Sequence, residues 1–85
     1  MDIFYTSKFE RAFKKLDISI KRLAINKEQL FRENYRNPRL KTHKLNWKLE
    51  WYYSFSVDYS YRILFEFMDD WNVLFLNIWD HNIYK

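Results

Sequence analysis

The chain has 85 residues, a net charge of +4 and an aromatic content of 22%. A chain of this length forms one domain, so we expect residues 1–85 to fold as a single domain around a core of aromatic rings. The absence of cysteine excludes disulfides and thiolate metal sites, and the absence of a long apolar run or a secretory signal predicts a cytoplasmic protein with no contact to the membrane.

The sequence begins with a pattern typical of a strand followed by a helix. Residues 2–6 are rich in aromatic and β-branched side chains, as expected of a short strand. Ser7 and Glu10 have the spacing of a capping box, and the apolar residues that follow recur at helical intervals, which predicts a helix over residues 8–16.

A second helix is predicted to follow almost at once. Asp17 is a suitable N-cap, and an apolar helical face continues to Phe31, so we expect this helix to end by Tyr35. Pro38 disfavours a helical conformation of the residue before it and separates the helical half from the rest. Two helices joined so closely should form an antiparallel hairpin.

The second half of the sequence predicts strands. Residues 36–48 (RNPRLKTHKLNWK) should form an extended basic segment. Residues 51–57 and 60–67 alternate in the manner of half-buried strands, and a last strand over residues 73–79 follows a turn at 68–72. Because the chain has no glycine, we expect Asp and Asn in that turn to take the positive-φ positions.

These elements predict an α+β fold. It consists of an N-terminal strand, a helical hairpin and three antiparallel strands, with both helices on one face of a four-stranded sheet. The opposite face is then open to a ligand. The alternation assigns Ser54, Ser56 and Arg62 to this open face, and Trp51 and Tyr53 to the core face.

Charge is divided unequally along the chain. Residues 1–49 hold thirteen Lys or Arg against five Asp or Glu, whereas residues 50–85 hold two against six. Such a division suggests a face that binds a polyanion, although basic helix faces in contact with water explain the charge equally well.

Four segments, in this order, resemble the RelE/ParE superfamily of bacterial toxins, in particular its RelE and YafQ-like branch. They are THKL at 42–45, WYYSFSV at 51–57, YRILFEF at 61–67 and the terminal DHNIYK. The resemblance implies the toxin of a type II toxin–antitoxin system, with a cognate antitoxin as its partner. RelE-like members are mRNA interferases, endoribonucleases that bind the ribosome, cut mRNA in the A site and so inhibit translation. ParE-like members poison DNA gyrase and do not cut RNA.

The resemblance also implies roles for individual residues. Arg62 matches the arginine that contacts the transition state, and His81 stands where RelE-like toxins have a catalytic Arg or His. Tyr84 matches a C-terminal aromatic residue, and His43 matches a histidine that the YafQ-like branch uses. We therefore expect all four residues to be catalytic.

The sequence departs from the family pattern at three points. Ser54 and Ser56 occupy positions where RelE has lysines and where YafQ-like toxins have acidic and His residues, and Trp79 and Asp80 replace a usual glycine. The residues expected to bind RNA lie in the basic segment and on the following strand: Arg39, Lys41, Lys44, Lys48, Ser54 and Ser56.

The catalytic residues suit metal-independent RNA cleavage by attack of the 2′-hydroxyl. Histidine can hold or release a proton near neutral pH, so His81 and His43 fit the base and the acid that this reaction needs. Arg62 offers a fork of donors to the phosphate oxygens, and Tyr84 can stack on a base or orient the hydroxyl. The histidines fit no usual metal-ligand spacing, so no metal or other cofactor is expected.

Each role has a simpler alternative. His43 is equally well explained as a surface residue, Arg62 could pair with Glu66 on its own strand, and Tyr84 could pack against the sheet edge. For the whole chain, a ParE-like gyrase poison without RNase activity and a degenerate, inactive family member both stay open.

Overall fold

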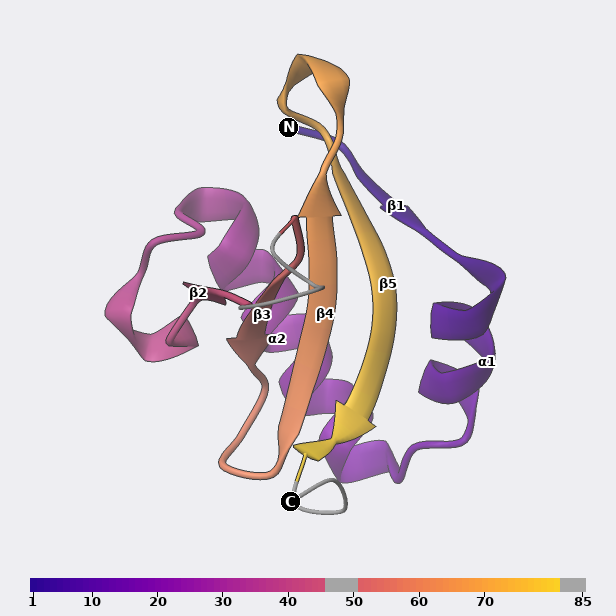
Figure 1. Ribbon diagram of the computed structural model, residues 1–85. Helices are drawn as coiled ribbons and strands as arrows, with labels where there is room; N and C mark the ends of the chain where they lie inside the picture. The colour runs from indigo at the N-terminus through magenta and orange to yellow at the C-terminus, as the bar shows by residue number, and fades with distance from the viewer. Residues whose placement is uncertain (46–50, 82–85) are drawn as a thin grey trace.

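The computed structural model describes residues 1–45 and 51–81 and confirms the α+β architecture (Figure 1). Strand β1 (Ile3–Tyr5) leads into the helices α1 (Ser7–Lys14) and α2 (Ile18–Glu33). The other strands are β2 (His43–Lys44), β3 (Tyr53–Ser56), β4 (Tyr61–Phe67) and β5 (Val73–Asp80). No helix in these ranges is long and apolar enough to cross a membrane.

The strands form one sheet in the order β1-β5-β4-β3-β2. β1 runs parallel to β5, and the other neighbours are antiparallel. The prediction of four strands was one short, because β2 pairs with β3 through only two residues, too few to produce a visible alternation. The basic segment is also not extended throughout, since Pro38–Leu40 forms a 3₁₀ helix before β2.

Both helices pack on one face of the sheet through aromatic rings. Phe9 of α1 and Phe31 of α2 contact Phe75 of β5, with ring centroids 5.5 and 5.6 Å apart. Phe31 also packs on Phe55 and Phe65, and these three rings are completely buried. In Figure 1, α2 passes behind β3 and β4, so the opposite sheet face is turned toward the reader.

Two caps determine where the helices begin, and the sequence misplaced one of them. Thr6, one residue before the predicted cap, is the N-cap of α1. Its hydroxyl accepts a hydrogen bond from the Phe9 N–H (3.0 Å) and donates one to the Leu76 carbonyl of β5 (2.9 Å). Thr6 therefore joins the helix to the sheet. Asp17 caps α2 as predicted, accepting from the Ser19 N–H at 3.1 Å.

Two exposed tryptophans depart from the prediction. Asp70 takes a positive φ of 65° in the turn between β4 and β5, as expected, but the second positive-φ residue is Trp71 rather than an asparagine. Trp51, predicted on the core face, is 75% exposed. The reason is that β3 begins only at Tyr53, so Trp51 lies before the regular alternation starts.

Candidate functional site

Arg62 of β4 is held in place by neutral groups of two neighbouring segments. Its Nε–H donates to the Ser54 hydroxyl of β3 at 2.9 Å, and Nη2 donates to the Lys41 carbonyl at 3.1 Å. Nη2 also lies 3.3 Å from Nδ1 of His43. Burial lowers the pKa of Arg62 below its ordinary value, yet arginine keeps its charge in proteins. The guanidinium is therefore an oriented cation, partly withdrawn from water.

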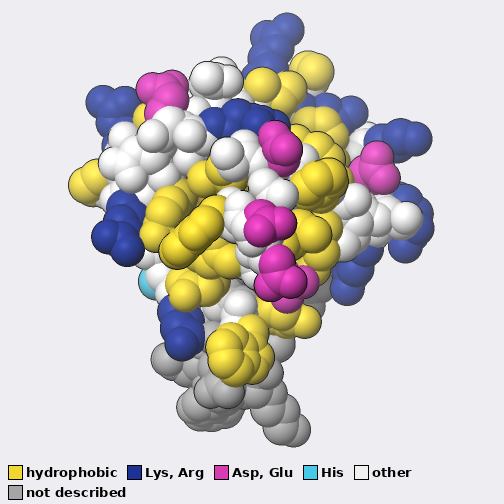
Figure 2. Space-filling model, turned by 90° about the horizontal axis from the view of Figure 1, so that it is seen from above, with side chains coloured by type: hydrophobic (Ala, Val, Ile, Leu, Met, Phe, Trp, Pro, Cys, Tyr) yellow, Lys and Arg dark blue, Asp and Glu magenta, His cyan; other side chains and the backbone are white. Residues whose placement is uncertain are grey.

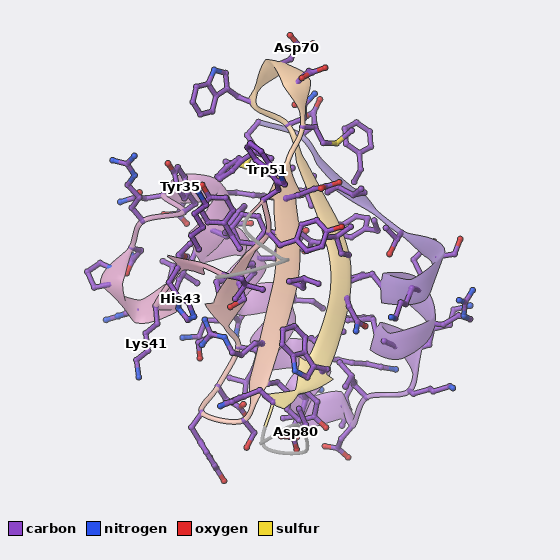
Figure 3. All side chains as sticks on the ribbon, viewed as in Figure 1. Tyr35, Lys41, His43, Trp51, Asp70 and Asp80 are labelled. Carbon is purple, nitrogen blue, oxygen red and sulfur yellow. The ribbon has the colours of Figure 1, made fainter. Side chains whose placement is uncertain are left out.

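Local backbone geometry brings these partners to Arg62. The register pairs His43 of β2 with Ser54 of β3, so the two side chains are cross-strand neighbours. Lys41 closes the 3₁₀ helix in the left-handed conformation, with φ 50° and ψ 44°, and its carbonyl meets both Arg62 and His43. Figure 3 shows Lys41 and His43 together beside β3, with the Lys41 side chain pointing away from the sheet.

The imidazole of His43 faces a donor and an acceptor at the same nitrogen. Nδ1 is 3.1 Å from the Lys41 carbonyl oxygen and 3.3 Å from Nη2 of Arg62. When Nδ1 carries the proton it donates to the carbonyl, and Nε2 is left to accept a proton. When Nε2 carries the proton, Nδ1 accepts from Arg62 instead. The site therefore holds His43 at a fixed position in either tautomer.

His81 lies one strand away, on the other side of β4. Its backbone N–H donates to the Ser60 carbonyl at 2.8 Å, and its Nδ1 is 2.6 Å from the same oxygen. A carbonyl only accepts, so Nδ1 carries a proton and Nε2 is available for proton transfer. The cross-strand partner of Arg62 is Trp79, two residues before His81. Arg62 and His81 share no hydrogen bond in the described part of the chain.

Ser54 and Ser56 are buried, which contradicts the prediction that they contact RNA directly. Ser54 is 1% exposed and its hydroxyl is engaged by Arg62. Ser56 donates to the Asp58 carbonyl at 2.5 Å. The alternative pairing of Arg62 with Glu66 is also wrong, because within residues 1–45 and 51–81 the partners of Arg62 come from β3 and the segment before it.

The other predicted RNA-binding residues are only partly located. Arg39, Lys41 and Lys44 are exposed near the β2 edge, so contacts to phosphate stay a prediction for them. Lys48 and Tyr84 lie outside the described residues. Among the residues that are described, no three His, Asp or Glu side chains gather where they could hold a metal ion.

Charge distinguishes the β2 edge from the turn between β4 and β5. Asp69 and Asp70 are exposed at that turn. Figure 2 views the molecule from that end and shows acidic side chains in the middle, hydrophobic ones beside them and Lys and Arg toward the rim. A polyanion is therefore repelled at this end and attracted to the β2 edge.

Cavities border the sheet on the side of α1 and at the β2 edge, in the part of the chain that the structure describes. The larger, about 340 Å³, lies between α1, α2 and the sheet and is mostly apolar. The smaller, about 290 Å³, includes His43 in its lining. Sequence reasoning missed this second cavity, although the adjacent Tyr35 and Arg36, an aromatic and a basic residue at the start of the basic segment, were an available signal.

Solved structures with the same arrangement of elements cover almost the whole chain. YafQ from Escherichia coli strain BL21(DE3) superposes with a TM-score of 0.73 at 18% identity, over 98% of this chain and 96% of that one. The fold is that of the RelE and YafQ toxins.

Two further structures with this fold are complexes of two different proteins. The RelBE2 toxin–antitoxin complex from Mycobacterium tuberculosis matches with a TM-score of 0.69 at 24% identity, over 93% of this chain and 95% of that chain. The archaeal RelE–RelB complex from Pyrococcus horikoshii matches with a TM-score of 0.74 at 12% identity, over 93% and 92%. No protein-family model and no curated protein matches the sequence.

Proposed function

We propose that this chain is the toxin of a type II toxin–antitoxin system and that it cuts mRNA on the ribosome. The observation that carries the proposal is the position of Arg62, fixed by Ser54 and the Lys41 carbonyl and placed beside His43. The toxin fold supports it, and the antitoxin complexes among the similar structures support an antitoxin as partner.

Arg62 is the group that stabilises the transition state. Its bonds to Ser54, Lys41 and His43 use Nε and Nη2, so within residues 1–45 and 51–81 the N–H groups of Nη1 are left to donate to phosphate oxygen. Because the guanidinium is already oriented and partly desolvated, little reorganisation is needed when charge develops on the phosphate. Ser54 acts as a positioning residue for Arg62 and does not touch RNA.

His43 and His81 flank the strand that carries Arg62. In-line attack of a 2′-hydroxyl requires a base on one side of the phosphate and an acid on the other. The strand order puts His43 on the β2 side of Arg62 and His81 at the end of β5 on the opposite side. We assign His43 as the base and His81 as the acid for the leaving 5′-oxygen. Tyr84 is proposed to position the substrate, and Arg39, Lys41, Lys44 and Lys48 to hold phosphates.

Cleavage of mRNA on translating ribosomes tests this proposal. We expect Arg62→Ala to slow cleavage by about a hundredfold or more, the range found when a preorganised charge-stabilising donor is removed. Arg11→Ala removes the same charge from the exposed surface of α1 and serves as the matched control. Cleavage by Arg62→Ala at the rate of Arg11→Ala would exclude this site.

The pH dependence of cleavage distinguishes the roles of His43 and His81. A base must be unprotonated and an acid protonated, so His43→Ala should remove the limb of the pH–rate profile that rises with pH. His81→Ala should remove the limb that falls at higher pH. Loss of the same limb in both variants would contradict the assignment of roles.

A second candidate function is a gyrase poison that needs no catalytic histidine. The serines of β3 favour it, because Ser54 and Ser56 occupy positions where RelE has lysines. Supercoiling by purified gyrase decides between the two. Inhibition there, together with intact mRNA on ribosomes, would reverse the order of the candidates.

A further inference from the structure

Most residues that line the cavity beside His43 have no role in the proposed cleavage at Arg62. It measures about 290 Å³ and lies at the β2 edge of the sheet. Its lining combines aromatic rings with basic and hydroxyl side chains: Tyr35, Tyr53, Phe67, Arg36, Thr42, His43 and Lys44.

The three rings pack against the margin of the hydrophobic core and stay partly open to solvent. Phe67 meets Tyr35 and Tyr53 edge to face, with centroids 5.2 and 5.1 Å apart. All three rings stay partly exposed, whereas the neighbouring Phe65 is completely buried. The guanidinium carbon of Arg36 lies 5.4 Å from the centre of the Tyr35 ring, so a planar cation extends the aromatic surface.

From this lining we infer that the cavity binds the base of the nucleotide next to the phosphate that Arg62 holds. Unpaired RNA bases stack on aromatic rings and on arginine planes, and Arg36 and Lys44 add positive charge for the adjoining phosphate. His43 lines the cavity and lies 3.3 Å from Nη2 of Arg62. Tyr53 and Phe67 belong to the helix side of the sheet and Arg62 to the opposite face, so His43 connects the two subsites around the β2 edge. The inference rests on the proposed function and extends it to the recognition of a base.

The cavity between α1 and α2 provides the contrast. Its lining contains the carboxylates of Glu10 and Glu28 with Lys14 as the basic residue, whereas the β2 cavity is lined by Arg36 and Lys44 and by no acidic side chain among the described residues. Phosphate is therefore attracted to the β2 cavity and not to the larger one. An acidic peptide would satisfy the charge of the β2 cavity, but the three rings select a planar base.

Nucleotide binding to the purified full chain tests the inference without ribosomes. The four nucleoside 3′-monophosphates are titrated by NMR, with ribose 5-phosphate as the probe that lacks a base. We expect at least one nucleotide to bind about tenfold more tightly than ribose phosphate, because stacking contributes about that factor per base. Tyr53→Leu should abolish this advantage, and Tyr53→Phe, which keeps the ring, should preserve it.

Arg36→Ala provides a second variant in case Tyr53→Leu does not fold. Arg36 is exposed, so its replacement should leave the unfolding midpoint unchanged while nucleotide binding weakens several-fold. Equal affinity for nucleotides and ribose phosphate, or nucleotide affinity unchanged in the folded variants, overturns the inference. In either case the site binds phosphate or an acidic peptide without recognising a base.

The sites of cleavage on mRNA separate this inference from the proposed function. Nucleotide binding together with intact mRNA refutes the nuclease and leaves the base site standing. Cleavage with the same distribution of cut sites in wild type and Arg36→Ala refutes the base site and leaves the nuclease standing. We expect cleavage by both proteins, with a broader choice of base at the cut site in the variant.

Discussion

Ser54→Ala is the most direct perturbation of the arrangement around Arg62. The substitution removes the acceptor that the Nε–H of Arg62 uses at 2.9 Å, at a position only 1% exposed where water does not easily take its place. A hydrogen bond to a charged group contributes about 1.5–3 kcal/mol, and the lower value applies because Arg62 is only partly buried. We expect the free energy of unfolding to fall by about 1.5 kcal/mol, measured by urea denaturation.

The same substitution should slow RNA cleavage, because Arg62 loses its orientation toward the phosphate. If the whole of that energy is expressed in the transition state, the rate at saturating ribosomes falls roughly tenfold. Ser54→Thr keeps a hydroxyl at this position and should recover most of the rate. A variant that loses stability but cleaves at the wild-type rate would refute the role of Ser54.

Ser56→Ala is the matched control. Ser56 lies two residues along the same strand and is also buried, but its hydroxyl donates to the Asp58 carbonyl and not to Arg62. The loss of stability should be similar, about 1 kcal/mol, while the cleavage rate per folded molecule stays that of wild type. Equal cleavage by Ser54→Ala and Ser56→Ala would show that β3 acts through stability alone.

Three further predictions concern backbone and pH. Lys41→Gly should raise the free energy of unfolding by about 0.5–1 kcal/mol. The φ of 50° at Lys41 costs a residue with a side chain about 1–2 kcal/mol, and glycine loses part of this gain because it has more conformational entropy in the unfolded chain. A free energy of unfolding below that of wild type, measured in urea, would contradict this. Burial and the hydrogen bond to Glu28 raise the pKa of Tyr5. Its contribution to stability is therefore complete below about pH 10 and is lost as the pH rises through the folded pKa. The unfolding temperature of wild type should fall over this alkaline range, and Tyr5→Phe should remove that dependence on pH. The hydroxyl and N–H of Ser19 lower the pKa of Asp17. The Asp17 cap therefore stabilises α2 above the unfolded pKa, and this stabilisation is lost as the pH falls through the folded pKa. Circular dichroism should show a loss of helix below about pH 4 in wild type and not in Asp17→Asn.

The sequence predicted the elements whose burial is periodic. In β4, Ile63 and Phe65 are buried on the helix side while Arg62 and Leu64 alternate with them, and this pattern is visible in the sequence. The two residues of β2 have no such pattern, because their pairing depends on β3 and not on their own side chains. The fifth strand could therefore be found only from the folded chain.

The candidate site likewise contains parts that the sequence pattern predicts and parts that depend on contacts between strands. Arg62 and His43 could be selected as candidates from the sequence, but their contact depends on the pairing of β2 with β3 and on the left-handed conformation of Lys41. The burial of Ser54 was missed because alternation places a residue on a face and does not show that a long side chain from the next strand will cover it. The side chains of the candidate site were predictable here, and the backbone groups that position them were not.

The choice of neutral partners explains how Arg62 can be both oriented and available. A carboxylate at position 54 would orient the guanidinium equally well, but it would also cancel the charge that a phosphate must find. A hydroxyl, a carbonyl and an imidazole bond the same N–H groups without cancelling that charge. Arg62 is the only Lys or Arg between Lys48 and Lys85, in the acidic half of the chain. Ser54 is therefore consistent with an active site, because it preserves a positive charge where the two halves of the chain meet.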